Sequence, residues 1–217
     1  MINLGLSKRE GTPLHVLCLG CHSDDIEIGC GGTILRLAEQ YPGTVFHWVV
    51  FSAIGPREDE ARRGAALFTR GGNLSAPLLR TFRDGFMPFS GAEIKEVFEE
   101  LKSNVQPDLV LTHYRQDAHQ DHRLISELTW NTFRDHLILE YEIPKYDGDM
   151  SQPGFYVPLS ENVYQKKVRY LMEAFQSQRA KRWFQECTFL GLMRLRGMEC
   201  NSPTGYAEAF HCRKLVF

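Results

Sequence analysis

An apolar run that ends in a group of polar residues is the feature of this sequence that most restricts its fold. The run covers residues 14–19, and the group follows at 21–25 with the sequence CHSDD. In open α/β sheets, ligands bind just beyond the carboxyl ends of strands, where loops on a rigid scaffold bring polar side chains together. The stretch therefore predicts a buried strand with a functional site at its end.

Apolar segments and helical segments alternate over the first two thirds of the chain. The apolar segments predict further strands at residues 44–52, 78–82, 109–113 and 137–142. The helical segments predict helices at residues 34–40, 56–70, 92–103 and 123–133. This order predicts an α/β protein with a Rossmann-like three-layer fold, in which a mainly parallel sheet is flanked by helices.

Local patterns add further expectations. A loop, two helices and a terminal strand are expected at residues 143–153, 163–178, 179–197 and 206–217. Ser90 and Glu93 fit a capping box at the start of a helix. The glycine-rich turn at 29–32 (GCGG) permits either close packing of a helix on the sheet, which we favour, or a nucleotide phosphate, although it lacks the GxGxxG spacing.

The composition is that of one ordinary globular domain. The 217 residues, 43% apolar and 24% charged, suffice for a single core, so we expect one domain over residues 1–217. A net charge of −2 argues against a nucleic-acid partner, and no apolar run approaches the roughly 20 residues that span a membrane. The N-terminal residues show no export signal, which together with free thiols favours the cytoplasm. Cys18 and Cys21 form a CxxC pair, but it spans a strand end, which disfavours a redox motif.

A second polar cluster follows the strand predicted at 109–113. Residues 113–122 (HYRQDAHQDH) hold three of the eight histidines and two aspartates. Because the carboxyl ends of neighbouring parallel strands meet at one edge of a sheet, both clusters are expected to face the same crevice. Either cluster alone fits a solvated turn with surface histidines, but the two together predict a metal or substrate site.

Imidazole and carboxylate groups suit a divalent ion such as Zn²⁺ or Fe²⁺. A catalytic zinc needs three protein ligands and one open position, and His22, one adjacent aspartate and a histidine of the second cluster could supply the ligands. Side chains of neighbouring residues diverge, so one of Asp24 and Asp25 can ligate while the other acts as general base. These residues predict a metal-dependent hydrolase.

The two clusters carry a resemblance to a known family. The stretches at 22–25 (HSDD) and 119–122 (HQDH) resemble the His-Pro-Asp-Asp-Glu and His-x-Asp-His motifs of the PIG-L/LmbE family of zinc-dependent N-deacetylases. The resemblance implies three zinc ligands, namely His22, Asp25 and His122.

The same resemblance implies roles for three other residues. Asp24 is implied to be the general base, and His119 to stabilise the oxyanion of the tetrahedral intermediate. Asp121 is implied to orient or tune that histidine. All three are therefore candidate catalytic residues.

Weaker matches extend the resemblance to substrate contacts. Arg57 begins an Arg-x-x-Glu motif like the family's, which implies a sugar contact. Asp84 begins an Asp-Gly pair whose aspartate is implied to bind sugar hydroxyls, and Glu208 lies in a segment similar to the closing strand, which implies a place near the substrate.

The chain departs from the family pattern at two positions. Ser23 replaces the usual proline, which loosens the turn without removing a functional group. Ile26 replaces the usual glutamate, and Glu27 follows one position later, so the function of that acid is unassigned here. The implied metal ligands and base are present.

The predicted function is removal of an N-acetyl, or other N-acyl, group from an amino sugar or sugar conjugate by a zinc-dependent hydrolase. Two alternatives stay open: a metal-dependent amidase on a non-sugar N-acyl compound, and a metal- or sugar-binding module without turnover. Asp24 argues against the module, because ligation alone needs no second carboxylate. The expected partner is a small N-acetylated sugar or conjugate, and the apolar C-terminal helices leave a homo-oligomer open.

Overall fold

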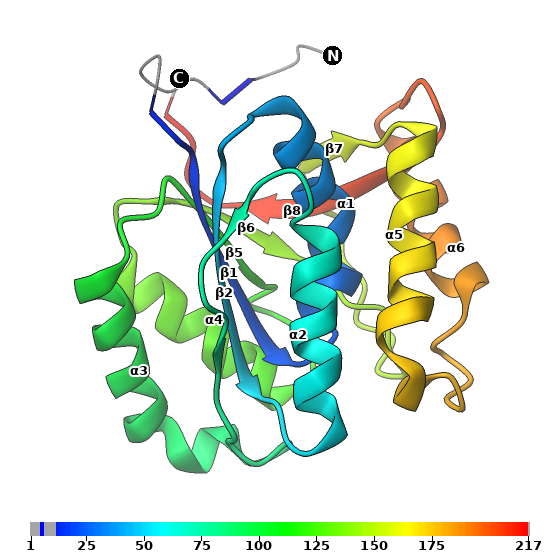
Figure 1. Ribbon diagram of the computed structural model, residues 1–217. Helices are drawn as coiled ribbons and strands as arrows, with labels where there is room; N and C mark the ends of the chain where they lie inside the picture. Colours follow the sequence, from blue (N-terminus) through cyan, green and yellow to red (C-terminus); the bar gives the residue numbers. More distant parts are fainter. Residues whose placement is uncertain (1–4, 7–11, 217) are drawn as a thin grey trace.

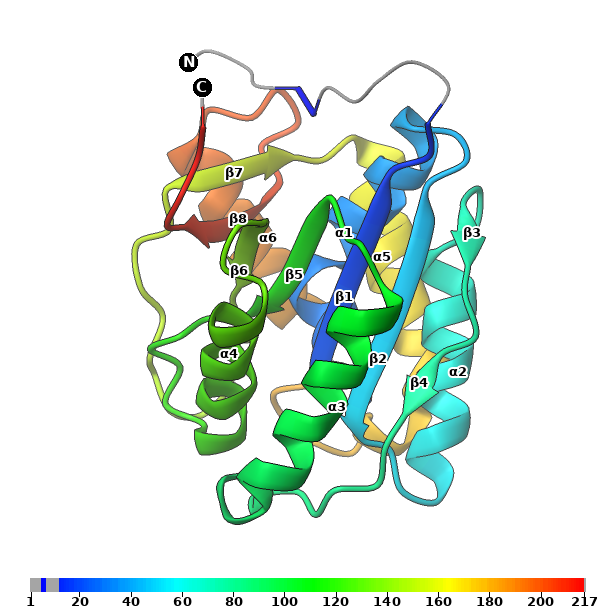
Figure 2. The ribbon, with the colours of Figure 1, turned by 90° about the vertical axis from the view of Figure 1, so that its left-hand side faces the viewer.

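The computed structural model describes residues 5–6 and 12–216, which form a sheet between two layers of helices (Figure 1). The helices are α1 (Asp25–Gln40), α2 (Pro56–Phe68), α3 (Gly91–Asn104), α4 (Gln120–Thr132), α5 (Glu161–Ala174) and α6 (Glu186–Glu199). Helices α3 and α4 cover one face of the sheet, and α1, α2 and α5 cover the other, with α6 beside α5 (Figures 1 and 2). The predicted three-layer α/β fold is confirmed.

The sheet is mainly parallel and has eight strands within the described residues. They are β1 (His15–His22), β2 (Val45–Ser52), β3 (Asn73–Leu74), β4 (Leu78–Leu79), β5 (Leu109–His113), β6 (Leu137–Tyr141), β7 (Phe155–Pro158) and β8 (Ala207–Cys212). Their order is β3-β2-β1-β5-β6-β8-β7, and β4 pairs with β2 beside that path. The first six strands pair in parallel, whereas β8 is antiparallel to β6 and β7.

Side chains of β1 alternate between two cores. Val16 and Cys18 pack with the layer of α1, α2 and α5, whereas Leu17, Leu19 and Cys21 pack with α3 and α4. All five are fully buried. Because Cys18 and Cys21 belong to opposite faces of the sheet, their thiols do not form a redox pair.

Helix α1 begins at Asp25, nine residues before the predicted start, so the expected glycine-rich turn is wrong. The glycines lie inside the helix, which is kinked at Cys30. A Cβ atom on Gly29 would lie 2.1 Å from the ring of Tyr141, and one on Gly31 would lie 2.4 Å from the ring of Phe68. The glycines therefore allow helix and sheet to approach closely, which confirms the favoured alternative over a phosphate site.

The kink in α1 is stabilised by a buried carboxylate. The backbone N–H groups of Gly32 and Thr33, just after the kink, donate to Glu208 at 2.7 and 2.6 Å. Lys167 Nζ lies 2.6 Å from Glu208 Oε1 and balances its charge inside the core. The second half of α1 thus begins at a new helix N-terminus, whose free N–H groups are capped by the Glu208 carboxylate of β8.

The structure differs from the local predictions at four points. Ser90 does not cap α3 with its side chain, because it ends a 3₁₀ helix, Met87–Ser90 (η1), that runs straight into α3. Residues 179–185 are a loop instead of helix, and β7 has no counterpart among the predicted strands. The predicted terminal strand ends at Cys212, and its last expected residue, Phe217, lies outside the described residues.

No helix in the described part of the chain is long and apolar enough to cross a membrane.

The close approach at Gly29 gives a stability test. Gly29→Ala should lower the free energy of unfolding by about 1–3 kcal/mol, because the added methyl group overlaps the buried ring of Tyr141. Gly91→Ala is the matched control, since a Cβ atom there meets nothing within 4 Å at the start of α3. Denaturant unfolding of both variants measures the difference, and equal stability would contradict the packing described.

Candidate active site

The two polar clusters meet because β1 and β5 are parallel neighbours. His22 is the last residue of β1, and Asp25 is the first of α1. His122 lies in the first turn of α4, the helix that follows β5. The carboxyl ends of the central strands point to the lower edge of the sheet in Figure 1, and this edge carries both clusters.

Three candidate metal ligands converge at this edge. His22 Nδ1 lies 3.2 Å from Asp25 Oδ2, and His122 Nε2 lies 3.5 Å from the same oxygen. The two ring nitrogens are 3.3 Å apart. Asp25 and His122 are buried, and the side chain of His22 is 16% exposed, so the cluster opens to solvent only on the His22 side.

The outer partners of the two histidines fix where their protons lie. His122 Nδ1 lies 3.0 Å from Asp117 Oδ2, and His22 Nε2 lies 2.9 Å from Asp84 Oδ1. A carboxylate oxygen accepts hydrogen bonds, so in the neutral rings these outer nitrogens carry the hydrogen. The inner nitrogens then present lone pairs to each other and to Asp25, with no proton between the three atoms.

This arrangement fits a divalent metal ion. Bonds of about 2.1 Å at tetrahedral angles separate neighbouring ligand atoms by about 3.4 Å. The three separations here are 3.2, 3.3 and 3.5 Å, with two nitrogens and one oxygen as donors. Zn²⁺ and Fe²⁺ both accept this donor set. His22, Asp25 and His122 are therefore the residues that could hold the ion.

The cluster also requires positive charge. Burial raises the pKa of Asp25, but His122 and His22 outweigh it and hold that pKa well below its ordinary value. Burial lowers the pKa of His22, but Asp25 and Asp121 raise it well above its ordinary value. A carboxylate this deeply buried is stable only beside a cation, either an imidazolium or a metal ion.

His113, the last residue of β5, belongs to the site although no role was predicted for it. Its ring stacks on that of His122 at 3.9 Å, and its Nε2 lies 3.3 Å from Asp25 Oδ2. The backbone N–H of Cys21 donates to the same Nε2 at 3.0 Å. Donor atoms of Cys21, Asp25, His113 and His122 lie within 4.8 Å of one another, which makes them an alternative ligand set. The hydrogen bond from Cys21 engages the lone pair of His113 and favours the set with His22.

Asp117 is a second residue that sequence reasoning missed. It orients His122 through the 3.0 Å contact to Nδ1, and Lys145 Nζ lies 3.0 Å from the same carboxylate oxygen. Its pKa lies below the ordinary value, because His122, His113 and Lys145 outweigh the effect of burial. A ligand histidine is usually oriented by such a partner, and Asp117 in the second cluster was the available sequence signal.

Asp24, the predicted general base, is buried and paired with Arg57. Arg57 Nη2 donates to Asp24 Oδ1, and Arg57 Nη1 donates to Glu60 Oε2 at 2.8 Å. Glu60 is fixed in turn by the backbone N–H and hydroxyl of Ser177, each at 2.8 Å. Burial raises the pKa of Asp24, and Arg57 opposes that rise. The predicted sugar contact Arg57 therefore lies against the predicted base.

His119 lies beside the ligand cluster and has a defined tautomer. Its ring stacks on that of His122 at 4.6 Å and meets that of His22 edge-on at 5.1 Å. The backbone N–H of Asp121 donates to His119 Nδ1 at 3.2 Å. Burial lowers the pKa of His119, so at neutral pH the ring is uncharged and carries its proton on Nε2.

Asp121 and Asp84 lie beside His22, where ligand atoms of His22, Asp84, His119 and Asp121 lie within 4.8 Å of one another and form a second group that could hold an ion. The Asp121 carboxylate is buried and accepts the N–H groups of Gly85 and Met87 at 2.7 and 3.2 Å. Its Oδ2 is 3.6 Å from His22 Nε2. The Asp84 side chain is 71% exposed, so it combines its contact to His22 with free access to solvent. Asp121 thus reaches His119 through its backbone, and its carboxylate fixes the segment that carries Asp84.

Two acidic residues lie apart from this group. Glu208 is engaged by α1 and Lys167, and among the described residues it contacts none of the other predicted site residues. Glu27 is fully buried beside α2, where a Cβ atom on Gly64 would lie 2.0 Å from its Oε1. Burial raises the pKa of Glu27 well above its ordinary value.

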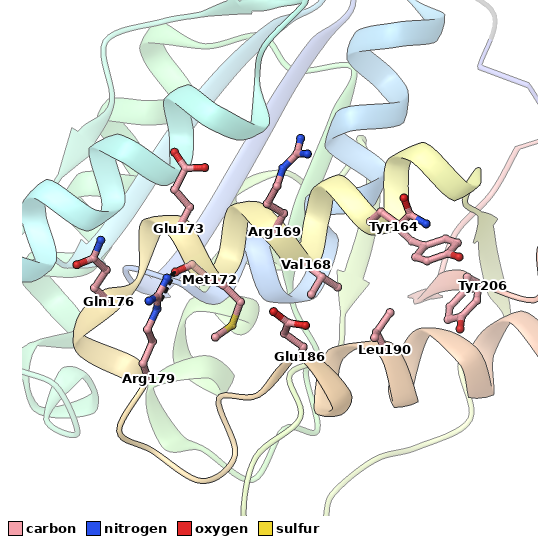
Figure 3. Close-up of a pocket in the computed structure, with 11 residues that line it drawn as sticks. Tyr164, Val168, Arg169, Met172, Glu173, Gln176, Arg179, Glu186, Leu190 and Tyr206 are labelled. Carbon is pink, nitrogen blue, oxygen red and sulfur yellow. Dashed lines mark hydrogen bonds between the residues drawn. The ribbon is translucent and has the colours of Figure 1, made fainter.

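A separate groove of about 630 Å³ lies between α5 and α6 (Figure 3). Its lining combines apolar side chains such as Val168, Met172 and Leu190 with charged ones such as Arg169 and Glu186. It contains no histidine, cysteine or aspartate and none of the residues described above. The groove is therefore distinct from the candidate active site.

Comparison with known proteins identifies the family. Residues 17–133, more than half of the chain, match the PIG-L family model, which is described as GlcNAc-PI de-N-acetylase. The chain belongs to the PIG-L family. The matched PIG-L region runs from β1 through α4 and contains both polar clusters, so the resemblance seen in the motifs is confirmed.

Three solved structures share the fold of this PIG-L chain. N,N'-diacetylchitobiose deacetylase from Pyrococcus horikoshii has a TM-score of 0.72 at 19% identity and covers 92% of this chain and 83% of its own. GalB, the 4-carboxy-2-hydroxymuconate hydratase from Pseudomonas putida KT2440, has a TM-score of 0.72 at 18% identity, with coverages of 94% and 98%. The zinc-inhibited form of teicoplanin deacetylase Orf2 has a TM-score of 0.66 at 14% identity, with coverages of 91% and 97%.

Metal binding tests the ligand set of this PIG-L chain. After reconstitution with Zn²⁺, elemental analysis should find about one ion per chain. His22→Ala and His122→Ala should each weaken binding by more than the roughly 10–100-fold that loss of a supporting residue costs, because each removes a donor atom. His136→Ala is the control, since that ring packs on Phe133 outside the cluster. Stoichiometric binding by both ligand variants would contradict the assignment.

Proposed function

We propose that this chain is a metal-dependent hydrolase that removes an N-acetyl group from an amino sugar or sugar conjugate. The observation that carries the proposal is Asp24, a buried carboxylate next to the Asp25 ligand position and held by Arg57. A site that only bound a metal would need no second carboxylate there. Membership of the PIG-L family, whose model is described as a de-N-acetylase, supports the same reaction.

The donor set fits Zn²⁺ or Fe²⁺, held by His22, Asp25 and His122. When bound, such an ion supplies Lewis-acid activation of water and of the substrate carbonyl. Asp117 and His113 hold His122 and Asp25 in place for it.

Asp24 is the proposed general base. Water adds to the amide carbonyl carbon while Asp24 takes one of its protons, and the same proton passes to the nitrogen as the C–N bond breaks. The products are acetate and the free amine. Burial raises the proton affinity of Asp24, which suits this proton transfer. The ion pair with Arg57 keeps Asp24 charged until it takes the proton from water.

His119 is the proposed hydrogen-bond donor to the oxyanion. Asp121 N–H occupies its Nδ1, so the Nε2–H is free to donate as negative charge develops on the carbonyl oxygen. The ring of His119 can donate this hydrogen bond while it is neutral, so it adds no positive charge beside the metal ligands. Asp121 supports the geometry by fixing residues 85–87.

Substrate contacts are proposed for Asp84 and Arg57. Asp84 is exposed beside His22, which suits a hydrogen bond to a sugar hydroxyl. Arg57 is partly exposed and can contact substrate while it holds Asp24. Glu208 is proposed to act on the site only through α1, since its contacts are to that helix and Lys167.

Related structures support deacetylation but also define a rival. The relatives from P. horikoshii and the teicoplanin system are named as deacetylases. GalB is named as a hydratase, so the same fold also carries addition of water without amide cleavage. Release of an amine is the result that separates the two reactions.

We further propose a cytoplasmic location, which suits six free thiols, and self-association through the α5–α6 surface.

Asp24→Asn tests the proposed base. The variant should keep the fold and bound metal but release amine from N-acetylglucosamine or N,N'-diacetylchitobiose at least about 100-fold more slowly, because the amide cannot accept the proton. Asp59→Asn, on the exposed side of α2, is the matched control and should keep the parent rate. An Asp24→Asn enzyme with full metal content and the parent rate would refute the mechanism.

Asp84→Asn separates a sugar substrate from a non-sugar amide. For a sugar, the variant should raise KM several-fold in samples reconstituted to the metal content of the parent, because a charge-assisted hydrogen bond to a hydroxyl is lost. A non-sugar amidase would keep its KM for its best amide. Metal content is measured in the same samples, since Asp84 also contacts His22.

A further inference from the structure

Arg57 joins two buried carboxylates at the start of α2. Its Nη2 donates to Asp24, the proposed general base, and its Nη1 donates to Glu60 Oε2 at 2.8 Å. Its guanidinium carbon also lies 5.7 Å from the centre of the Phe175 ring, which is fully buried. An arginine side chain has many rotamers, so a single contact to Asp24 would leave the guanidinium free to turn. Glu60 and Phe175 restrict that freedom.

Glu60 is oriented by Ser177, a residue 117 positions later in the chain. Ser177 lies in the 3₁₀ helix Gln176–Gln178 (η2), which follows α5. Its backbone N–H donates to Glu60 Oε1 and its hydroxyl donates to Glu60 Oε2, each at 2.8 Å. Both oxygens of the carboxylate are therefore engaged by Ser177, and the carboxylate cannot rotate without losing a hydrogen bond.

The hydroxyl of Ser177 is itself held in one direction. The side-chain amide of Gln178, a buried residue, donates to Ser177 Oγ at 2.9 Å. The backbone N–H of Gln178 donates to the carbonyl of Phe175 at 3.1 Å. Since a hydroxyl has a single hydrogen, an oxygen that accepts from Gln178 directs its own hydrogen to Glu60. The short η2 helix thus presents two fixed donors to one carboxylate.

The fold brings this distant segment to the active site. Helices α2 and α5 lie side by side and run in opposite directions, so the end of α5 lies beside the first turns of α2 (Figure 1). The first turns of α2 follow β2, whose last residue, Ser52, pairs with His22 in β1. The contacts therefore run from η2 through Glu60 and Arg57 to the edge of the sheet that carries both polar clusters.

We propose that Glu60 and Ser177 are positioning residues for the reaction, which act through Arg57 to hold the Asp24 carboxylate in the place where it takes the proton from water. This inference rests on the proposed function. Glu60 and Ser177 alone would suffice to join α2 to η2, and Arg57 adds the link from that joint to the base. A base must be held closely, since a misplacement of about 1 Å can cost roughly 100-fold in rate.

Amine release from N,N'-diacetylchitobiose by the zinc-loaded enzyme tests the proposal. Ser177→Ala should lower kcat about 2–10-fold, because one hydrogen bond to Glu60 is lost at a position that is otherwise exposed. Ser177→Thr keeps the hydroxyl and should restore most of the parent rate. Glu60→Gln should lower kcat roughly 10–100-fold, since an amide cannot accept from all three donors. Ser103→Ala, whose hydroxyl bonds within α3, is the matched control and should keep the parent rate.

A double-mutant cycle separates positioning from a general loosening of the fold. Arg57→Lys keeps a positive charge but loses the planar fork that contacts both carboxylates. In that background Ser177→Ala should change kcat by less than about twofold, because its effect passes through the fork. A merely structural effect of Ser177 would lower kcat by the same factor in both backgrounds, which would overturn the proposal.

The outcomes also separate this inference from the proposed function. A zinc-loaded parent that releases no amine would overturn both. An active parent, with Asp24→Asn inactive but Ser177→Ala and Glu60→Gln at the parent rate, would overturn the inference alone. Elemental analysis and thermal unfolding of each variant check that metal and fold are kept. If Glu60→Gln does not fold, Ser177→Ala and its cycle with Arg57→Lys decide the question.

Discussion

Asp25 Oδ2 lies within 3.5 Å of both His22 Nδ1 and His122 Nε2, and when both rings are neutral their outer partners leave no proton between these atoms. Such a contact between lone pairs is unfavourable without a cation and favourable with one. The residues come from two strand ends, which are held side by side by the parallel pairing of β1 with β5. The candidate site therefore depends on the central sheet, which brings together groups that need a cation, either an imidazolium or a metal ion.

The surrounding structure compensates the charge and fixes the geometry. Arg57 pairs with the buried Asp24, and Lys145 pairs with the buried Asp117. The glycines of α1 allow Tyr141 to pack against the helix that begins with Asp25, and Tyr141 in turn lies 3.2 Å from His113 Nε2. A buried carboxylate that keeps its charge needs partners of this kind. The same contacts that stabilise the core therefore hold the reactive groups in register.

Much of this could be predicted from the sequence, because local pattern determines it. The apolar runs predicted the parallel strands, and the polar residues after two of them predicted which strand ends form a site. The start of α1 was missed, since glycines at 29, 31 and 32 have low helix propensity, and only their close contacts with Tyr141, Phe68 and Leu159 respectively explain them.

The pairings between distant residues could not be predicted from spacing. Arg57 meets Asp24 across 33 positions, and Lys145 reaches Asp117 from a loop without regular structure. His113 was visible in the second cluster, but its role follows from ring stacking on His122, which only the fold supplies.

X-ray absorption at the zinc edge of the reconstituted protein separates the ligand set with His22 from the set with Cys21, because it gives the elements and distances of the ligand atoms without reference to turnover. With His22, Asp25 and His122 as ligands, the spectrum should show a shell of nitrogen and oxygen only, at about 2.0–2.2 Å, with the multiple-scattering signal of two imidazoles. A sulfur ligand at about 2.3 Å would contradict it, since that would place the ion with Cys21, Asp25, His113 and His122 instead.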